Sequence, residues 1–211
     1  MIRLLLCLCL VFITGCSSAY YGAWEKFGVY KRDILVKRVA ASKESQEEAK
    51  EEFSSALDEF IAVTKIDSGK LESQYRKVEA AYTDAEDAAQ EVRDRNNETD
   101  RVAKALFKEW DKEIDSFEST ELKLESRRQF RTSKQRYEEL IKTMRRAERR
   151  LDPVLRQFRD QTLFLKHNLN ARAIAALQPK AARITSDVNR LIADMNRSIA
   201  EAESFIASMK E

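Results

Sequence analysis

The chain has 211 residues, with 38 Lys and Arg against 36 Asp and Glu, a net charge of +2 at pH 7. This balance excludes a strongly basic or acidic protein that recruits a partner through its overall charge. Four Gly and two Pro are too few for the many turns of a large sheet, while abundant Ala, Glu, Lys, Leu and Arg are typical of long helices. The composition therefore predicts an all-α protein.

The first residues have the features of a secretory signal peptide. Arg3 precedes an apolar run at 4–13, which is too short for a transmembrane helix of about 20 residues. The sequence that follows resembles the bacterial lipobox, which predicts cleavage between Gly15 and Cys16 and acylation of Cys16. Residues 1–15 are therefore expected to be removed, and the acyl chains on Cys16 to anchor the rest of the chain to a membrane.

The predicted location is the cell envelope. By resemblance to Gram-negative lipoproteins, Ser17 after the acylated cysteine favours the outer membrane, and we expect the protein to face the periplasm. Cys7 and Cys9 leave with the signal peptide and Cys16 carries lipid, so the mature chain is expected to have no disulfide. An apolar core must then hold residues 16–211 together as one elongated domain.

The first predicted helix, 20–65, has the weakest pattern. Apolar residues recur on one face, at Trp24, Leu35, Val39, Ala49, Phe53, Ala56, Phe60 and Val63. A polar stretch at 42–46 interrupts this face. The aromatic residues Tyr20, Tyr21 and Trp24 at its start suit a membrane interface. Alternatively, they pack against aromatic residues of the other helices, namely Phe107, Trp110 and Phe205.

The second predicted helix, 70–117, has a heptad pattern with steps of four and three. Its seam consists of Leu71, Tyr75, Val78, Tyr82, Ala85, Ala89, Val92, Asn96, Thr99, Ala103, Leu106, Trp110 and Phe117. Glu113 fills the one gap in this series. We interpret Asn96 and Thr99, with Gln46 of the first helix, as polar residues that fix the register between helices. A small cavity lined by these residues is the alternative.

The third predicted helix, 121–166, has an apolar residue at every seventh position. The series consists of Phe130, Tyr137, Met144, Leu151, Phe158 and Leu165. Its phase continues through Pro153, so this proline is expected to bend the helix without ending it. Ser119 and Thr120 are candidate N-caps ahead of Glu121.

The fourth predicted helix, 172–209, has a series that is out of register with Leu165. This series consists of Leu177, Ala181, Ile184, Val188, Leu191, Met195, Ser198, Ala202, Phe205 and Met209. A turn is therefore expected near 167–173. The alternative is a three-helix coiled coil, in which the third helix runs through 170–178 and the last begins at Pro179. The break in phase favours four helices.

Short connections predict a long antiparallel four-helix bundle. The N-terminus, the 118–121 turn and the C-terminus should then share one end of the bundle. The turns at 67–70 and 167–173 should share the other end.

A basic run in the third helix has two interpretations. Residues 127–150 contain ten Lys and Arg against three Glu. As a face for lipopolysaccharide phosphates or another envelope polyanion, its candidates are Arg127, Arg128, Arg131, Arg145, Arg146, Arg149 and Arg150. Acidic segments at 44–59 and 79–100 offer the other interpretation, in which the charges form flanking pairs between helices. We favour the second interpretation.

Nothing in the sequence is typical of catalysis. His167 is the only histidine, and no Gly-rich phosphate-binding loop or Cys/His pair is present. A di-iron bundle needs two Glu-x-x-His motifs, whereas Phe164 stands three residues before His167. We therefore expect a non-enzyme without metal or cofactor, and His167 to lie in a turn or on the surface. Because exported proteins meet little nucleic acid, we also expect no nucleic-acid partner.

Two hypotheses for function remain. In the first, an interaction or scaffold protein presents one end of the bundle to a protein or wall partner, and self-association stays open. The candidate residues at this end are Ser68, Phe164, His167, Asn168 and Asn170. In the second hypothesis, the bundle opens to hold a lipid or another apolar ligand. The candidate residues around that ligand are Phe60, Tyr75, Phe158 and Phe164.

Some segments are more distinctive than a generic heptad repeat. Residues 20–36 read YYGAWEKFGVYKRDILV, and residues 158–161 and 164–175 read FRDQ and FLKHNLNARAIA. These segments resemble the proteobacterial lipoprotein family known as domain of unknown function 2959. The resemblance covers essentially the whole mature chain and implies a helical envelope lipoprotein of undefined role. It supplies no catalytic or binding residues.

Overall fold

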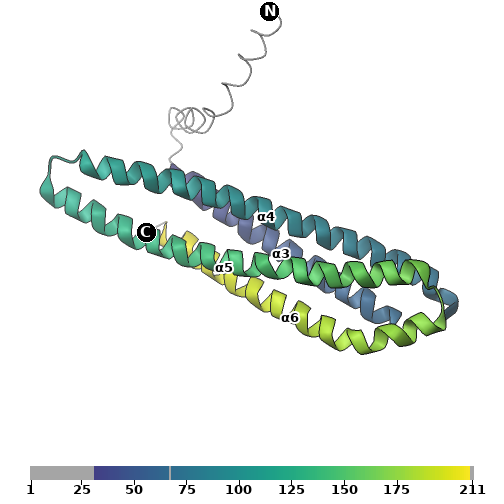
Figure 1. Cartoon of the computed structure of the whole chain (residues 1–211). Coiled ribbons are helices and arrows are strands. Elements are labelled where there is room, and N and C mark those ends of the chain that lie inside the picture. Colours follow the sequence, from purple (N-terminus) through teal and green to yellow (C-terminus); the bar gives the residue numbers. More distant parts are fainter. Residues whose placement is uncertain (1–30, 67, 210–211) are drawn as a thin grey trace, which may run out of the picture.

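A computed structural model describes residues 31–66 and 68–209, which form four long helices (Figure 1). The helices are α3 (Lys31–Val63), α4 (Leu71–Asp115), α5 (Thr120–His167) and α6 (Ala171–Ser208), with a 3-10 turn η1 (Ser68–Lys70) before α4. Each helix packs against the next, and α6 packs against α3, so the bundle is closed. The predicted all-α four-helix bundle is confirmed. The signal peptide, Cys16 and the predicted helical segment 20–30 lie outside the described residues.

The two ends of the bundle differ in what they contain. The near end holds the first residue of α3, the α4–α5 turn and the end of α6 (Figure 1). The far end holds the α3–α4 connection and the α5–α6 turn. With 48 residues, α5 is about 72 Å long at 1.5 Å per residue. The described part is therefore a rod with two distinct tips.

Side-chain caps explain where α5 and α6 begin. Ser119 Oγ accepts a hydrogen bond from the Leu122 amide at 3.3 Å. Asn170 Oδ1 accepts from the amides of Arg172 and Ala173 at 3.0 and 3.2 Å. These bonds satisfy amides that have no partner within the helix. Because α5 ends at His167 and α6 starts after Asn170, the three-helix alternative is wrong.

Both prolines of the chain lie inside helices. Pro153 lies within α5 and Pro179 within α6, each on an exposed position. Leu151 and Phe158, on either side of Pro153, remain buried on the same face. This confirms that Pro153 does not end the third helix.

The core consists of two apolar clusters. The far cluster contains Phe53 and Phe158, whose ring centroids are 6.4 Å apart. The near cluster contains Phe107, Tyr137 and Phe205, with 5.6 Å between the ring centroids of Phe107 and Tyr137. Burial of each such side chain stabilises the fold by about 1.5–3 kcal/mol. The predicted seam of α5 is confirmed, since all six of its members are buried: Phe130, Tyr137, Met144, Leu151, Phe158 and Leu165.

The predicted seam of α4 is wrong at the near end. Phe107 and Ile114 are buried there, while Phe117 is 41% exposed and Glu113 is also exposed. A straight helix has 3.6 residues per turn, so its buried face drifts away from a strict 3.5-residue repeat. In addition, α4 and α5 extend beyond the start of α3, and within the described residues neither α3 nor α6 reaches Phe117.

Candidate functional site

The far end carries an exposed apolar patch. Leu163, Phe164 and Leu169 are 47%, 38% and 40% exposed. Within the described residues, the other large exposed apolar side chains are Phe117, Leu122 and Leu124, all at the near end. Exposed large apolar side chains therefore gather at the two tips and are absent from the described length between them. We call Leu163, Phe164 and Leu169 the far-end patch.

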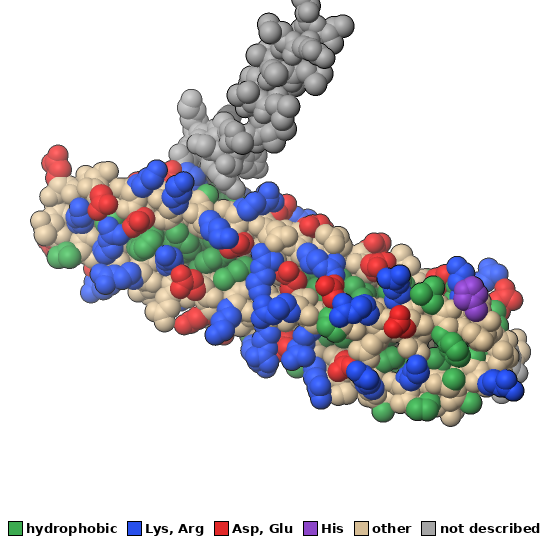
Figure 2. Space-filling model, viewed as in Figure 1, with side chains coloured by type: hydrophobic (Ala, Val, Ile, Leu, Met, Phe, Trp, Pro, Cys, Tyr) green, Lys and Arg blue, Asp and Glu red, His purple; other side chains and the backbone are tan. Residues whose placement is uncertain are grey.

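Basic side chains lie at the same end of the bundle as the far-end patch. Lys166 and Arg172 are exposed beside it, and residues 161–172 contain no acidic residue. Lys65 and Lys70, from the α3–α4 connection, are exposed at the same end of the bundle. Figure 2 shows hydrophobic and basic side chains together at this tip. The surface therefore favours a partner with an apolar face and acidic groups around it.

The predicted interaction residues gather at this tip but differ in role. His167 is exposed, as expected for a turn residue. Asn168 Nδ2 donates to the Phe164 carbonyl at 2.9 Å, and Asn170 caps α6, so both asparagines hold the turn. Ser68 begins η1 at the same end. Sequence reasoning missed Leu163 and Leu169, which lie off the seam defined by Phe158 and Leu165.

The aromatic residues proposed to surround an apolar ligand are divided between core and surface. Phe60 and Phe158 are 0% and 1% exposed and belong to the far cluster. Tyr75 is also buried, and its hydroxyl donates to Glu79, which raises the pKa of Tyr75 to about 12. Phe164 instead faces solvent. In this conformation Phe60, Tyr75 and Phe158 fill the interior themselves.

Five of the seven arginines of the predicted polyanion face pair with carboxylates. Arg127 pairs with Asp111 and Asp115, Arg128 with Glu125, Arg145 with Glu148, and Arg146 and Arg150 with Asp194. Arg131 and Arg149 are exposed. The pairs that join α5 to other helices run to α4 and α6, which supports the structural interpretation of the basic run. The acidic segment 44–59 does not flank α5, because α3 lies diagonally opposite α5.

Asp194 is the most buried carboxylate in these pairs, with a side chain 4% exposed. Its Oδ1 lies 3.0 Å from Arg146 Nε, and Arg150 Nε donates to its Oδ2. Burial disfavours the charged carboxylate, but the hydrogen bonds and charges of Arg150 and Arg146 outweigh burial and lower the pKa of Asp194. The carboxylate therefore links α6 to α5 in its ionised form.

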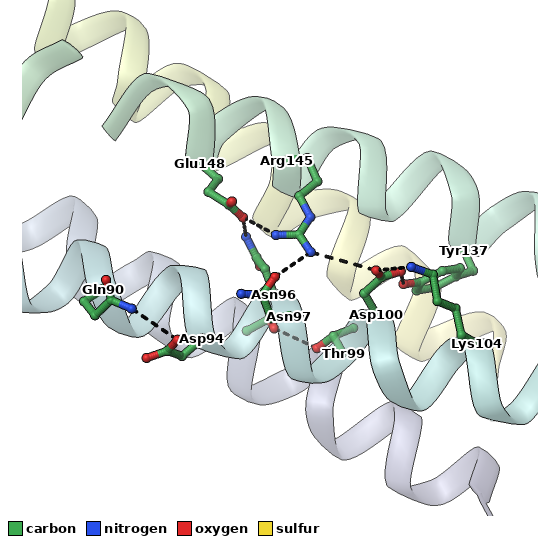
Figure 3. A network of polar contacts seen from close by, with 11 residues as sticks. Gln90, Asp94, Asn96, Asn97, Thr99, Asp100, Lys104, Tyr137, Arg145 and Glu148 are labelled. Carbon is green, nitrogen blue, oxygen red and sulfur yellow. Dashed lines mark hydrogen bonds and ion pairs between the residues drawn. The ribbon is translucent and has the colours of Figure 1, made fainter. Parts of the chain in front are cut away.

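A polar network joins α4 to α5 halfway along the bundle (Figure 3). Arg145 donates to Glu148 Oε2 at 2.7 Å and to Asn97 Oδ1 at 2.8 Å. Asn96 Nδ2 donates to the same Glu148 oxygen at 2.9 Å. This network fixes the height of α4 against α5, because Arg145 and Glu148 of α5 bind Asn97 and Asn96 of α4.

Asp100 and Tyr137 extend this network toward the near end. The Tyr137 hydroxyl donates to Asp100 Oδ1 at 2.9 Å, and Lys104 donates to Oδ2 at 2.7 Å. Burial opposes ionisation of Asp100, but these two hydrogen bonds and the charges of Lys104 and Arg145 together outweigh burial and lower the pKa of the carboxyl. Burial and the Asp100 carboxylate raise the pKa of the Tyr137 phenol. The pair therefore consists of a carboxylate and a neutral phenol at neutral pH.

Buried polar side chains separate the two apolar clusters. The hydroxyls of Ser42 on α3 and Thr99 on α4 are both fully buried and 2.9 Å apart. Gln46, Asn96 and Ser198 are also fully buried. We call these five residues the polar layer. Within the stretch 42–46, which interrupts the apolar pattern of the first helix, Ser42, Ser45 and Gln46 therefore face the interior.

The described residues contain neither a candidate membrane span nor a candidate metal site. None of the described helices is long and apolar enough to cross a membrane. Across residues 31–66 and 68–209, no group of three or more His, Cys, Asp or Glu side chains is placed to hold a metal ion.

Comparison with known proteins identifies a family. No curated protein and no solved structure matches the chain significantly. The family model described as protein of unknown function (DUF2959) matches residues 20–209, nearly the whole chain. The match confirms the resemblance read from the distinctive segments. The chain therefore belongs to the DUF2959 family, whose function is unknown.

Proposed function

We propose that this protein is a membrane-anchored helical lipoprotein of the cell envelope that binds a protein partner through its far-end patch. The observation that carries the proposal is the exposure of Leu163, Phe164 and Leu169 on one tip of a four-helix rod. The proposed role is structural rather than catalytic. Acylation of Cys16 supplies the anchor, and the outer membrane facing the periplasm is the proposed location.

The arrangement of the ends supports this orientation. The chain leads from Cys16 to the first residue of α3, which lies at the near end. An anchored rod then carries the far-end patch up to about 70 Å from the membrane surface, the length of α5. The patch is thereby placed away from lipid, where a partner in the periplasm has access to it.

The chemistry of the tip favours one class of partner. Binding gains free energy when a partner removes exposed apolar side chains from water. Lys166 and Arg172 favour acidic groups around that contact and increase the association rate at low salt. We therefore propose a protein that presents an apolar surface bordered by Asp or Glu.

The partner is tested by crosslinking in living cells. A photoreactive residue at Leu169 should capture a partner, while the same residue at Ser119 in the near-end turn serves as the matched position. The substitution Phe164→Asp should abolish capture from position 169, because it buries a charge in the apolar contact. Capture from Ser119 alone, or capture from 169 that is unchanged by Phe164→Asp, would contradict the proposal.

The anchor is tested separately. Cells grown with a labelled fatty acid should label the protein, and Cys16→Ala should remove the label and leave an unprocessed precursor. Fractionation should place the labelled protein in the outer membrane. An unlabelled protein in the soluble fraction would contradict the anchor without affecting the far-end patch.

A further inference from the structure

Two rows of charged side chains lie on opposite sides of the rod. One row is on the outward face of α3 and the other is on the outward face of α5. Because α3 and α5 lie diagonally opposite in the bundle, the two rows point in opposite directions. The acidic row consists of Glu44, Glu51 and Asp58, and the basic row consists of Lys142, Arg149 and Arg156.

Neither row is neutralised within the bundle. All six side chains are exposed, and none has a hydrogen bond or an ion pair with another described residue. Lys43 and Lys50, beside the acidic row, are bonded to α6 instead. Asp152, beside the basic row, pairs with Arg93 of α4. The charges of both rows are therefore available to another molecule.

The two rows match in height and in spacing. Lys50 Nζ of α3 donates to Asn196 Oδ1 of α6 at 2.9 Å. Arg150 of α5 donates to Asp194, two residues earlier on α6, so the two contacts are about 3 Å apart along the rod. The middle members of the rows are the sequence neighbours of Lys50 and Arg150. Both rows have a member at every seventh residue, about 10.5 Å apart, and α3 and α5 run in the same direction, so the end members match as well.

We propose that copies of this protein stand side by side and parallel, with the acidic row of one copy against the basic row of the next. The pairs between copies are Glu44 with Lys142, Glu51 with Arg149, and Asp58 with Arg156. The contact joins two different faces, so each copy keeps one row open after it has bound a neighbour. Such a contact extends into a line of rods and does not close as a two-fold dimer.

The proposed membrane anchor supplies the strength that this contact needs. Exposed ion pairs are individually weak, and salt screens them, so three of them do not hold freely diffusing rods together. Acylation of Cys16 holds all copies on one membrane in the same direction, which raises their effective concentration. The inference therefore rests on the proposed anchor for its strength, whereas the match between the rows comes from the described helices alone.

Disulfide crosslinking in cells that express the full chain tests the contact. Ser55 and Pro153 are exposed, uncharged positions within the acidic and basic rows. A chain with both Ser55→Cys and Pro153→Cys should form a ladder of dimers, trimers and larger species on oxidation. Each single variant should stay monomeric, because the contact places position 55 of one copy against position 153 of the next. The matched control has Thr83→Cys on α4 and Asn189→Cys on α6, which are also exposed, and should form no ladder.

Charge reversal in the double-cysteine chain identifies the residues responsible. Arg149→Glu and Glu51→Arg should each lower the yield of the ladder roughly 5-fold, because an attractive pair between copies becomes repulsive. Both reversals in one chain restore opposite charges between copies and should recover most of the ladder. Loss with Arg149→Glu that Glu51→Arg does not reproduce, and that the double reversal does not repair, would assign the basic row to a polyanion instead.

Three further outcomes would overturn the proposal. The first is a ladder no stronger than that of the control pair, and the second is a ladder that neither reversal weakens. The third is a dimer from Ser55→Cys alone that is as strong as the dimer from the double variant, which would place two acidic rows together. Membrane flotation of the same cells reports the anchor separately. Protein that floats without a ladder contradicts the contact between copies, whereas laddered protein that does not float contradicts the anchor.

Discussion

The two tips of the rod expose the same kind of side chain, but the chain segments that carry these side chains differ in charge. At the far end, Leu163, Phe164 and Leu169 lie in a segment, 161–172, with Lys166 and Arg172 and no acidic residue. At the near end, Phe117, Leu122 and Leu124 lie in a segment, 115–125, with four acidic residues and one Lys. Apolar exposure alone therefore does not make the tips equivalent, because the charges beside the apolar side chains differ.

The tips also differ in how they are supported. All four helices reach the far end, where the far cluster packs beneath the patch. Only α4 and α5 reach the near-end turn within the described residues. A patch on a four-helix base is ordered before a partner binds, which lowers the entropy cost of binding. The comparison therefore supports the proposal that a partner binds at the far end.

The largest expected effect on stability is at the far end, where a core residue is compared with a residue of the far-end patch. Phe158→Ala should lower the free energy of unfolding by about 3–5 kcal/mol, because it leaves a cavity in the far cluster. Phe164→Ala should change it by less than about 0.5 kcal/mol, since this side chain is 38% exposed. Urea unfolding followed by circular dichroism measures both. Equal losses would mean that Phe164 supports the core and that the far-end patch is no free surface.

The next largest effect concerns the ion pairs between α5 and α6, which lie between the two tips. Asp194→Asn should cost about 2 kcal/mol, because Arg146 and Arg150 lose a buried ionised acceptor. Glu72→Gln is the matched control, since Glu72 pairs with Arg76 on an exposed surface, and it should cost less than about 0.5 kcal/mol. Thermal unfolding of the three proteins makes the comparison. A similar cost for both variants would argue against a special role for the α5–α6 contact.

Removing the helix cap at each end allows the two ends to be compared directly by the loss of stability. Asn170→Ala should cost about 1 kcal/mol because two amides lose their acceptor. Ser119→Ala should cost less, since Ser119 accepts one longer bond, at 3.3 Å. Only Asn170→Ala should also weaken crosslinking from position 169, because it loosens the turn that carries Leu169. Weakening by Ser119→Ala would show that the ends are coupled.

The smallest expected effect is a dependence of stability on pH. The pKa values of Asp100 and Asp194 are lowered in the folded protein, so near pH 4 the unfolded chain binds more protons than the folded one. Their contribution to stability is therefore complete well above pH 4 and is lost as the pH falls through the lowered values. Unfolding free energies measured between pH 7 and pH 3 should decline less steeply for Asp100→Asn than for the parent. An unchanged slope would contradict the assigned pKa of Asp100.

The sequence was sufficient for the helices because burial repeats with helical spacing. The series from Phe130 to Leu165 holds at every seventh residue and survives Pro153, so α5 was predictable within a residue or two at each end. The change of phase after Leu165 located the last turn. The Asn170 cap, which the sequence analysis did not single out, explains the position of that turn.

Contacts between helices were less predictable, since they depend on register and on which helices are neighbours. No sequence pattern pairs Ser42 with Thr99, or Asp194 with Arg150. The acidic segment 44–59 was expected beside the third helix, yet α3 is diagonal to α5. At the far end, Leu163 and Leu169 resembled ordinary helix residues, and their exposure emerges only from the fold.

The polar layer has a consequence for folding. A heptad repeat allows α3 to slide by seven residues along α4 while its apolar residues still meet apolar residues. Such a slip would place Ser42 beside Val92 or Leu106 and leave its hydroxyl and that of Thr99 buried without partners. Each unmade bond costs about 1–3 kcal/mol. The layer therefore penalises misaligned, trapped forms and directs the collapsing chain to a single alignment.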